Sequence, residues 1–354
     1  MERVLETLCL ASRGLVENHV LVANTTTRTV QEAIGDVQVT RVGTIGAIGS
    51  VHLAPAFAAW MRRIPADVIV LHEPNPWALL SYAIAHPAAP LFIWYHSDVV
   101  RPALQYALFY APLARLVYGR AERIVVSSPP LAEHANGLKP YRERLRVVPF
   151  GIDASEWGCE GGSTDQGGDP FLLFAGRHVA YKGVDVLLHA LSQSRARAVI
   201  AGDGPQRRTW EALAGELRLD GRVSFVGEVP DAELRRLMNA CIALVLPSVT
   251  RAEAFGYVQL EAMASGKPVI STDVPSGVSW VNQHMRTGLV VRAGDAGALR
   301  GAIDRLSSDR ALCERLGSAG RARVEHEFTI ERLRERLREL YEESAVIPEW
   351  SAAC

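Results

Sequence analysis

LPSVTRAEAFGYVQLEAMASGKPVI, which spans residues 246–270, predicts a strand, a loop and a helix in succession. The apolar run from Ile242 to Leu246 has the length of a buried strand, and Pro247 ends it. The segment 255–265 is predicted to be a helix because it is mostly apolar and Gly266 follows directly. A strand, a loop and a helix form half of a parallel βαβ unit, and such units bind ligands at the carboxyl ends of their strands.

Two glutamates are unusual in this stretch. Glu261 falls in a helix that is apolar on most sides, and a buried carboxylate needs a hydrogen-bonding partner, which ribose hydroxyls would provide. Glu253 precedes the helix, and free backbone N–H groups around Gly256 and Tyr257 would suit a phosphate. A carboxylate, an anion site and a second carboxylate thus follow one another, and they would match the sugar, the diphosphate and the ribose of a nucleotide sugar. The spacing alone equally allows Glu253 to favour the helix dipole and Glu261 to pair with an arginine.

The bulk composition is that of a globular protein. At 354 residues, with 48% hydrophobic and 22% charged residues, the chain suits two domains. A net charge of -1 argues against broad nucleic-acid binding, which needs a basic face. The five cysteines are scattered without a Cys-x-x-Cys pair, which favours a reducing compartment. No run of 18 apolar residues occurs, so the expected localisation is cytoplasmic.

Strand and helix patterns alternate along both halves, which predicts two parallel sheets covered on both faces. The strands expected in the first half lie at 19–24, 37–43, 67–73, 91–96, 123–127 and 145–150. Those expected in the second half lie at 171–175, 198–201, 223–226, 242–246, 269–272 and 289–291. Gly43, Gly46 and Gly49 are expected in a flexible loop, and the glycine-rich segment Glu156 to Pro170 is the expected linker.

Several ordered motifs resemble those of family 4 of the retaining glycosyltransferases. They are EAFG at 253–256, EAMASGKPV at 261–269, FAGRHVAYKG at 174–183, AGDGP at 201–205, HSD at 96–98 and VPFGID at 148–153. The resemblance implies the GT-B fold, an α/β fold of two Rossmann-like, doubly wound domains that face a cleft. It implies an acceptor-side domain over residues 1–153, a linker over 154–169 and a nucleotide-sugar-binding domain over 170–328. A last helix within 329–354 would cross back to the first domain.

The first domain lacks one element of this pattern. The family begins with a strand and a Gly-Gly turn before the helix that here starts at Glu2. Because that strand is central in a doubly wound sheet, we expect a gap between the strands at 19–24 and 67–73. We favour an incomplete start of the sequence over a defective domain.

The resemblance also implies the site residues. Arg177 and Lys182 would neutralise a diphosphate leaving group, and His96 would face the transferred sugar, although a lone histidine is more often structural. The implied catalytic residues are His96, Arg177, Lys182 and Glu253. The implied nucleotide-sugar-binding residues are Arg177, Lys182, Glu253, Ala254, Phe255, Gly256, Tyr257 and Glu261.

Three further residues are weaker candidates. Glu73 is a candidate on the acceptor side, Asp98 would orient His96 or cap a helix, and His178 would line the cleft. The sequence holds no histidine pair or acidic cluster with metal-ligand spacing, so we expect no metal and no cofactor besides the donor.

The expected function is a retaining, metal-independent transfer of a hexose from a nucleotide-diphosphate sugar to an acceptor hydroxyl, in cell-surface glycan or glycolipid assembly. The segment 275–282 and the residues Arg251 to Glu253 most resemble the corresponding segments of mannosyltransferases that use GDP-mannose. Two alternatives stay open, a truncated relative that only binds a nucleotide sugar or a partner, and a GT-B nucleotide-sugar epimerase. The expected partners are the donor and a sugar or lipid-linked glycan acceptor.

The segment 102–123 carries leucines and arginines at helical spacing and allows two interpretations. Such a helix either packs on its sheet or lies on an anionic membrane as a basic amphipathic helix. The first 150 residues hold 14 Lys and Arg against 11 Asp and Glu, which suits a domain that contacts an anionic membrane.

Overall fold

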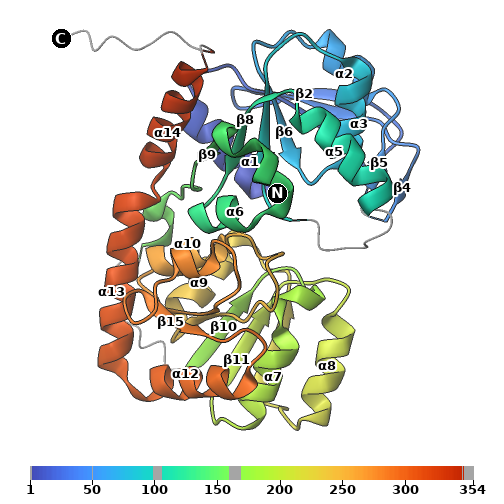
Figure 1. Cartoon of the computed structure of the whole chain (residues 1–354). Helices are drawn as coiled ribbons and strands as arrows, with labels where there is room; N and C mark the ends of the chain where they lie inside the picture. The colour runs from blue at the N-terminus through green and yellow to red at the C-terminus, as the bar shows by residue number, and fades with distance from the viewer. Residues whose placement is uncertain (1, 50, 99–105, 159–168, 345, 347–354) are drawn as a thin grey trace, which may run out of the picture. The chain divides into compact units, whose positions relative to one another are not determined.

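The chain folds into two compact α/β units (Figure 1). The computed structural model describes residues 2–49, 51–98, 106–158, 169–344 and 346. The first unit comprises residues 1–150 together with 333–354, and the second comprises residues 151–332. Most of the linker expected at 154–169 lies outside the described residues.

The second unit is built on one sheet of six parallel strands in the order β12-β11-β10-β13-β14-β15. The strand that comes first in the chain, β10, is central, as in a doubly wound sheet. Every residue of β13 and β14 is buried, as expected for strands of a parallel sheet that is covered on both faces, and β13 is entirely apolar. The strands are β10 (Phe171–Ala175), β11 (Arg197–Ala201), β12 (Val223–Gly227), β13 (Leu244–Leu246), β14 (Val269–Thr272) and β15 (Gly288–Val291).

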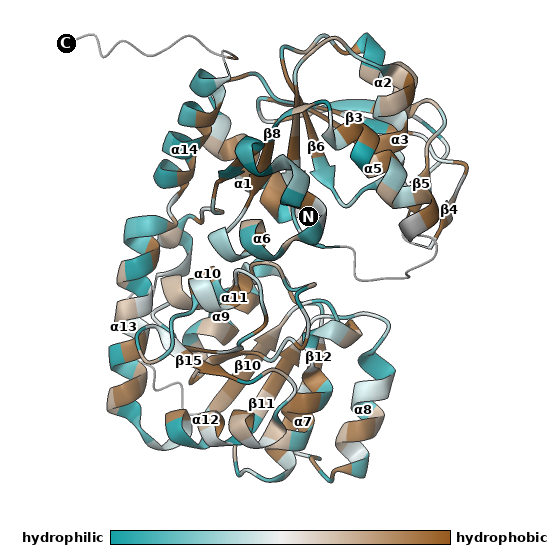
Figure 2. Cartoon of the chain, in the orientation of Figure 1, coloured by the Kyte–Doolittle hydropathy of each residue, from teal (hydrophilic) through white to brown (hydrophobic). Residues whose placement is uncertain are grey.

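Helices pack their apolar sides on this sheet. One core cluster joins Phe174 and Ile200 of the strands to Leu187 and Ile303 of two helices. Figure 2 shows the same division, with hydrophobic strands and hydrophilic outer faces on α8 and α13. The helices of this unit are η3 (Ala154–Trp157), η4 (Ala180–Lys182), α7 (Val184–Ser192), α8 (Arg207–Glu216), α9 (Asp231–Ala240), α10 (Val258–Ala264), α11 (Val278–Val281), α12 (Ala296–Ser308) and α13 (Arg310–Glu327).

The helix expected from Phe255 begins only at Val258, as α10. Gly256 has a φ of 71°, a left-handed conformation that cannot continue a helix. A Cβ at this position would lie 2.6 Å from the side chain of Leu246. Residues 255–257 therefore form a turn before the helix, held close to the end of β13.

The first unit contains separate sheets. The order is β1-β3-β2 in one, β6-β7-β8-β9 in the second, and β4-β5 in a hairpin. The predicted gap is confirmed, because in the described part of the chain β1 and β6 lie at the edges of different sheets. The strands are β1 (His19–Ala23), β2 (Val30–Ile34), β3 (Val37–Val42), β4 (Gly46–Ile48), β5 (Val51–Leu53), β6 (Ile69–Glu73), β7 (Leu91–Tyr95), β8 (Ala121–Val126) and β9 (Leu145–Val147).

Two features of this unit differ from the prediction. Strand β2 was not predicted, and it pairs antiparallel with β3. The glycine-rich segment expected as a flexible loop forms the antiparallel hairpin β4–β5, with Gly49 at a φ of 62° in its turn. Glycine supplies the positive φ that a tight hairpin turn requires.

Helices of the first unit include the end of the chain. From Leu333 onward α14 (Ile330–Glu343) belongs to this unit, where the ring of Tyr341 stacks on Phe92 with centroids 6.3 Å apart and Glu343 pairs with Arg146 at 2.7 Å. The other helices are α1 (Glu2–Ser12), α2 (Phe57–Arg63), α3 (Pro76–Ala85), the π-helix η1 (Tyr106–Tyr110), α5 (Ala111–Tyr118), α6 (Pro129–His134) and the 3-10 segment η2 (Asn136–Arg144). Among the described residues, no helix combines the length and apolar character needed to cross a membrane.

The interrupted sheet predicts uneven protection of the backbone. In the part of the chain that the structure describes, β1 pairs with one strand, β3, whereas β10 lies between β11 and β13. We expect amide hydrogens of β1 to exchange with solvent on the order of a hundredfold faster than those of β10 in native-state hydrogen exchange, because weakly supported elements open at lower free energy. Strand β3, which is paired on both sides, is the control within the same sheet. Equal protection of β1 and β10 would contradict this account.

Candidate active site

The carboxyl ends of β10 and β11 approach each other closely because glycines follow both strands. A Cβ on Gly202 would lie 2.0 Å from the carbonyl oxygen of Gly176, and a Cβ on Gly204 would lie 2.6 Å from that of His178. Gly176 and Gly202 have φ values of 154° and 116°, which favour glycine. These glycines let two loops meet at one point of the sheet edge, where ligands of doubly wound folds bind.

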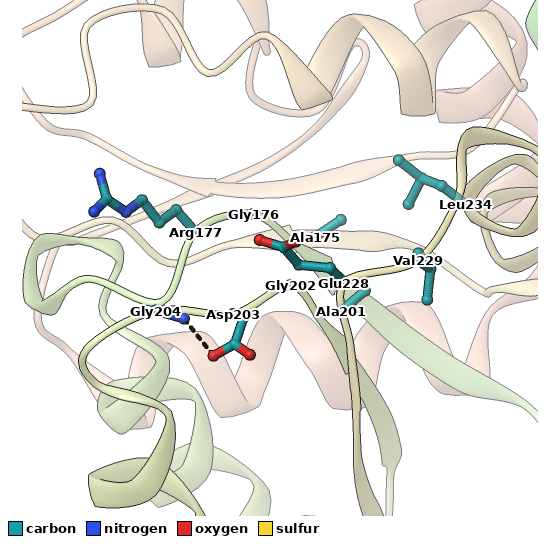
Figure 3. Close-up of a pocket in the computed structure, with 10 residues that line it drawn as sticks. All are labelled: Ala175, Gly176, Arg177, Ala201, Gly202, Asp203, Gly204, Glu228, Val229 and Leu234. Atoms are coloured by element: carbon teal, nitrogen blue, oxygen red, sulfur yellow. Dashed lines mark hydrogen bonds between the residues drawn. The ribbon is translucent and has the colours of Figure 1, made fainter. Parts of the chain in front are cut away.

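A pocket of about 680 Å³ opens at this edge (Figure 3). Its polar side chains are Arg177, Asp203 and Glu228, all of them exposed. Asp203 accepts a hydrogen bond from the backbone N–H of Gly204 at 2.6 Å. Figure 3 shows Arg177 at one end of the pocket and apolar Val229 and Leu234 at the other. The residues that line it are Ala175, Gly176, Arg177, Ala201, Gly202, Asp203, Gly204, Glu228, Val229 and Leu234.

Lys182 forms an ion pair with Glu253, with 2.6 Å between Nζ and Oε2. The two side chains are only 12% and 9% exposed, and the hydroxyl of Ser248 donates to the same carboxylate oxygen at 2.9 Å. Burial acts to lower the pKa of Lys182, but the Glu253 carboxylate outweighs this effect and the net shift is upward. Lys182 is therefore charged near neutral pH.

The backbone explains how this pair forms. Gly183 has a φ of 68°, and a Cβ there would lie 2.1 Å from the carbonyl oxygen of Pro247. The N–H of Val249 donates to the carbonyl of Tyr181 at 2.8 Å. The loop after β10 is thus pressed onto the loop after β13. The same arrangement places Nζ of Lys182 3.6 Å from where a Cβ of Gly176 would stand, beside Arg177.

The remaining residues of the 253–261 motif are largely buried in the second unit. Ala254, Phe255 and Glu261 are 7%, 3% and 2% exposed. The hydroxyl of Tyr257 donates to the carbonyl of Gly151 at 2.8 Å, and the hydroxyl of Ser276 donates to the carbonyl of Glu253 at 2.6 Å. The structure thus gathers Arg177, Lys182, Glu253 and the 254–257 turn on one edge of a single unit.

His96 belongs to the first unit and follows β7 directly. Its Nε2 lies 2.9 Å from Nδ1 of His72, and the two rings are stacked. Sequence reasoning missed His72, since nothing in the pattern of β6 marks it as a partner of His96. Asp98, a candidate orienting group or helix cap, accepts a hydrogen bond from the hydroxyl of Tyr95. The following residues, 99–105, lie outside the described chain.

Glu73 is fully buried and accepts a hydrogen bond from the hydroxyl of Tyr110 at 2.7 Å. Burial raises the pKa of Glu73 to about 8. Its carboxyl group is therefore mostly protonated near neutral pH. Tyr110 was not predicted as a partner.

His178 does not line the pocket. Its ring is fully buried and lies 5.0 Å from the ring of Trp210, so the expectation that it lines a cleft is wrong. Among the described residues, no group of three or more His, Cys, Asp or Glu side chains could hold a metal ion.

Comparisons with known proteins agree with this architecture. The family described as "Glycosyl transferases group 1" matches residues 162–323, and "Glycosyl transferase 4-like domain" matches residues 1–151. D-rhamnosyltransferase WbpZ of Pseudomonas aeruginosa is 31% identical over 337 residues, which cover 93% of this chain and 88% of that protein. O-antigen chain mannosyltransferase C of Escherichia coli is 32% identical over 271 residues, which cover 75% of this chain and 72% of that protein.

Among solved structures, a sucrose-phosphate synthase from Thermosynechococcus elongatus aligns with a TM-score of 0.80 at 24% identity. The alignment covers 96% of this chain and 92% of that one. This likeness supports the two Rossmann-like domains of the GT-B fold.

The buried ion pair predicts a specific pattern of stabilities. Lys182→Met should lower the free energy of unfolding by about 3 kcal/mol, because it leaves the buried Glu253 carboxylate without its cation. The double variant Lys182→Met/Glu253→Gln should recover most of that loss. Urea unfolding measures the free energy of unfolding of both variants and of the wild type.

A matched control is Arg310→Met, which breaks an ion pair with Glu314 whose side chains are 84% and 65% exposed. That change should cost less than about 1 kcal/mol. If the double variant is no more stable than Lys182→Met, the two groups are not coupled as described.

Proposed function

The chain belongs to the group 1 glycosyltransferases, and we propose that it transfers a hexose from a nucleotide-diphosphate sugar to an acceptor hydroxyl with retention of configuration. The observation that supports this most is the position of Arg177 and Lys182 beside the pocket at the end of β10. Two cations at this point suit a diphosphate, and Arg177 can bind it in a bidentate manner. A role in glycan assembly agrees with the name of one relative, the O-antigen chain mannosyltransferase.

The proposed mechanism uses charge stabilisation rather than a covalent enzyme intermediate. As the bond between sugar and diphosphate breaks, negative charge grows on the leaving group, and Arg177 and Lys182 stabilise it. The leaving diphosphate itself takes the proton of the acceptor hydroxyl on the same face of the sugar. We propose that the reaction needs no metal, because these two cations supply the positive charge.

Glu253 and Glu261 take separate roles in this proposal. Glu253 is held by Lys182 and Ser248 and would meet the hydroxyls of the sugar. Glu261, on α10, would accept hydrogen bonds from the ribose, and the 254–257 turn would meet the diphosphate. In the first unit, His96 would face the transferred sugar.

The proposed donor is GDP-mannose, in keeping with the mannosyltransferase among the relatives. The pocket offers a physical reason for guanine, since the edge of that base carries two adjacent N–H donors and the exposed carboxylate of Glu228 could accept both. The corresponding edge of uracil would offer only one N–H donor. Glu228 is therefore the proposed determinant of base preference.

We propose a cytoplasmic enzyme at the inner face of a membrane, acting on a lipid-linked glycan. The three cysteines in the described residues, Cys9, Cys241 and Cys313, are free thiols, which suits a reducing compartment. The membrane contact would be made by η1 and α5. Their inner side is packed, with Val117 buried, whereas Leu108, Phe109 and Leu116 are 59%, 74% and 61% exposed.

Calorimetry separates the two glutamates. Glu261→Gln should weaken binding of GDP about tenfold, because an amide is a poorer acceptor for ribose hydroxyls. Glu253→Gln should leave GDP binding within about twofold and lower sugar transfer on the order of a hundredfold. An equal loss of GDP binding in both variants would contradict the assignment.

Arg177 is tested separately. If the variant Arg177→Ala transfers sugar at the wild-type rate, Arg177 does not belong to the active site.

Vesicle sedimentation tests the membrane contact. The triple variant Leu108→Ser/Phe109→Ser/Leu116→Ser should bind vesicles of phosphatidylcholine with phosphatidylglycerol at least about tenfold more weakly than the wild type. The control is Val226→Ser, which replaces an exposed apolar residue on β12 of the second unit. If the triple variant binds the vesicles as tightly as the wild type, η1 and α5 do not make the membrane contact.

A further inference from the structure

His72 and His96 form a paired set of rings at the carboxyl end of the β6–β7 ladder. Their ring centroids are 5.1 Å apart with an interplanar angle of 16°, and Nδ1 of His72 lies 2.9 Å from Nε2 of His96. His72 is in register with Trp94, two residues before His96. Because side chains alternate along a strand, these three residues point to the same face of the sheet.

A second aromatic ring also packs against His96. Phe150 stacks on it with centroids 5.9 Å apart and an interplanar angle of 17°. Burial lowers the pKa of His72 to about 4 and lowers that of His96 well below its usual value. Both imidazoles are therefore neutral near pH 7, in a cluster with the rings of Trp94 and Phe150.

Neutral imidazoles constrain each other when they share a hydrogen bond. Each ring has one nitrogen that donates and one that accepts. The bond between the rings uses Nε2 of His96, so Nδ1 is the only ring nitrogen of His96 left to contact another molecule. Whichever ring supplies the proton, the bond also decides whether that Nδ1 donates or accepts.

We propose that His72 is a positioning residue, which holds the ring of His96 by occupying Nε2 and so presents Nδ1, in one tautomer, to the transferred sugar. This inference rests on the proposed function, in which His96 faces that sugar. It assigns a role to a residue that has no contact with the sugar itself. The role is distinct from packing, because it depends on the hydrogen bond and not on the stacked ring.

Two substitutions separate the hydrogen bond from the stacking. His72→Phe keeps an aromatic ring against His96 and removes the bond. His72→Asn removes the ring but places an amide where Nδ1 stood, so it can restore the bond. Nitrogen-15 NMR of the histidine rings in the full chain reports the tautomer of His96, and steady-state kinetics report transfer.

We expect His72→Phe to change the ring-nitrogen shifts of His96 to those of mixed tautomers and to lower kcat about tenfold or more, with the donor KM within about twofold. We expect His72→Asn to keep the wild-type shifts and a kcat within about threefold of the wild type. Circular dichroism confirms that each variant is folded.

Two results would overturn the positioning role. In one, His72→Phe leaves the shifts of His96 unchanged, whatever the activity. In the other, both variants lose transfer equally, which would mean that the ring acts only through packing. If the shifts respond as expected but no nucleotide sugar supports transfer, the proposed function fails while the coupling of the two rings stands.

Discussion

The buried ion pair between Lys182 and Glu253 fixes the two loops from which the edge of the second unit is built. Each loop follows a central strand, and close backbone contacts at Gly183 and Val249 leave little room for either to shift alone. A buried pair is stable only while both partners are present. In the proposed reaction, a diphosphate that approaches Lys182 competes with Glu253 for the ammonium group, and the carboxylate becomes available to the sugar.

The first unit positions its candidate residue differently. His96 follows β7, which is paired on both sides, and a hydrogen bond with a neutral ring together with aromatic packing, rather than an ion pair, holds its imidazole. The interruption between β1 and β6 lies on the far side of β6 from β7. His72 is on β6, so the strand that holds His96 in place is also one that has β7 as its single neighbour among the described strands. The stability of β6 and the geometry of the histidine pair are therefore linked.

The sequence predicted the second unit far better than the first. The bounds of two buried parallel strands were predicted without error, because β10 is a continuous apolar run that Gly176 follows and β14 begins directly after Pro268. Strand β2 was missed because all five of its residues are exposed and carry no apolar pattern. The start of α10 was misplaced because only the fold shows the positive φ of Gly256. Motifs located Arg177, Lys182 and Glu253, but the pairing of His72 with His96 depends on strand register.

The most direct measurement is a donor panel with mass detection of the released nucleoside diphosphate and of the glycosylated acceptor. The account predicts that one hexose donor, GDP-mannose, gives both products in equal amounts, without added metal, and that an α-linked donor gives an α-linked product. Binding of the donor without release would instead indicate a relative that no longer transfers sugar. Conversion of the donor to its epimer, without an acceptor, would contradict the central claim.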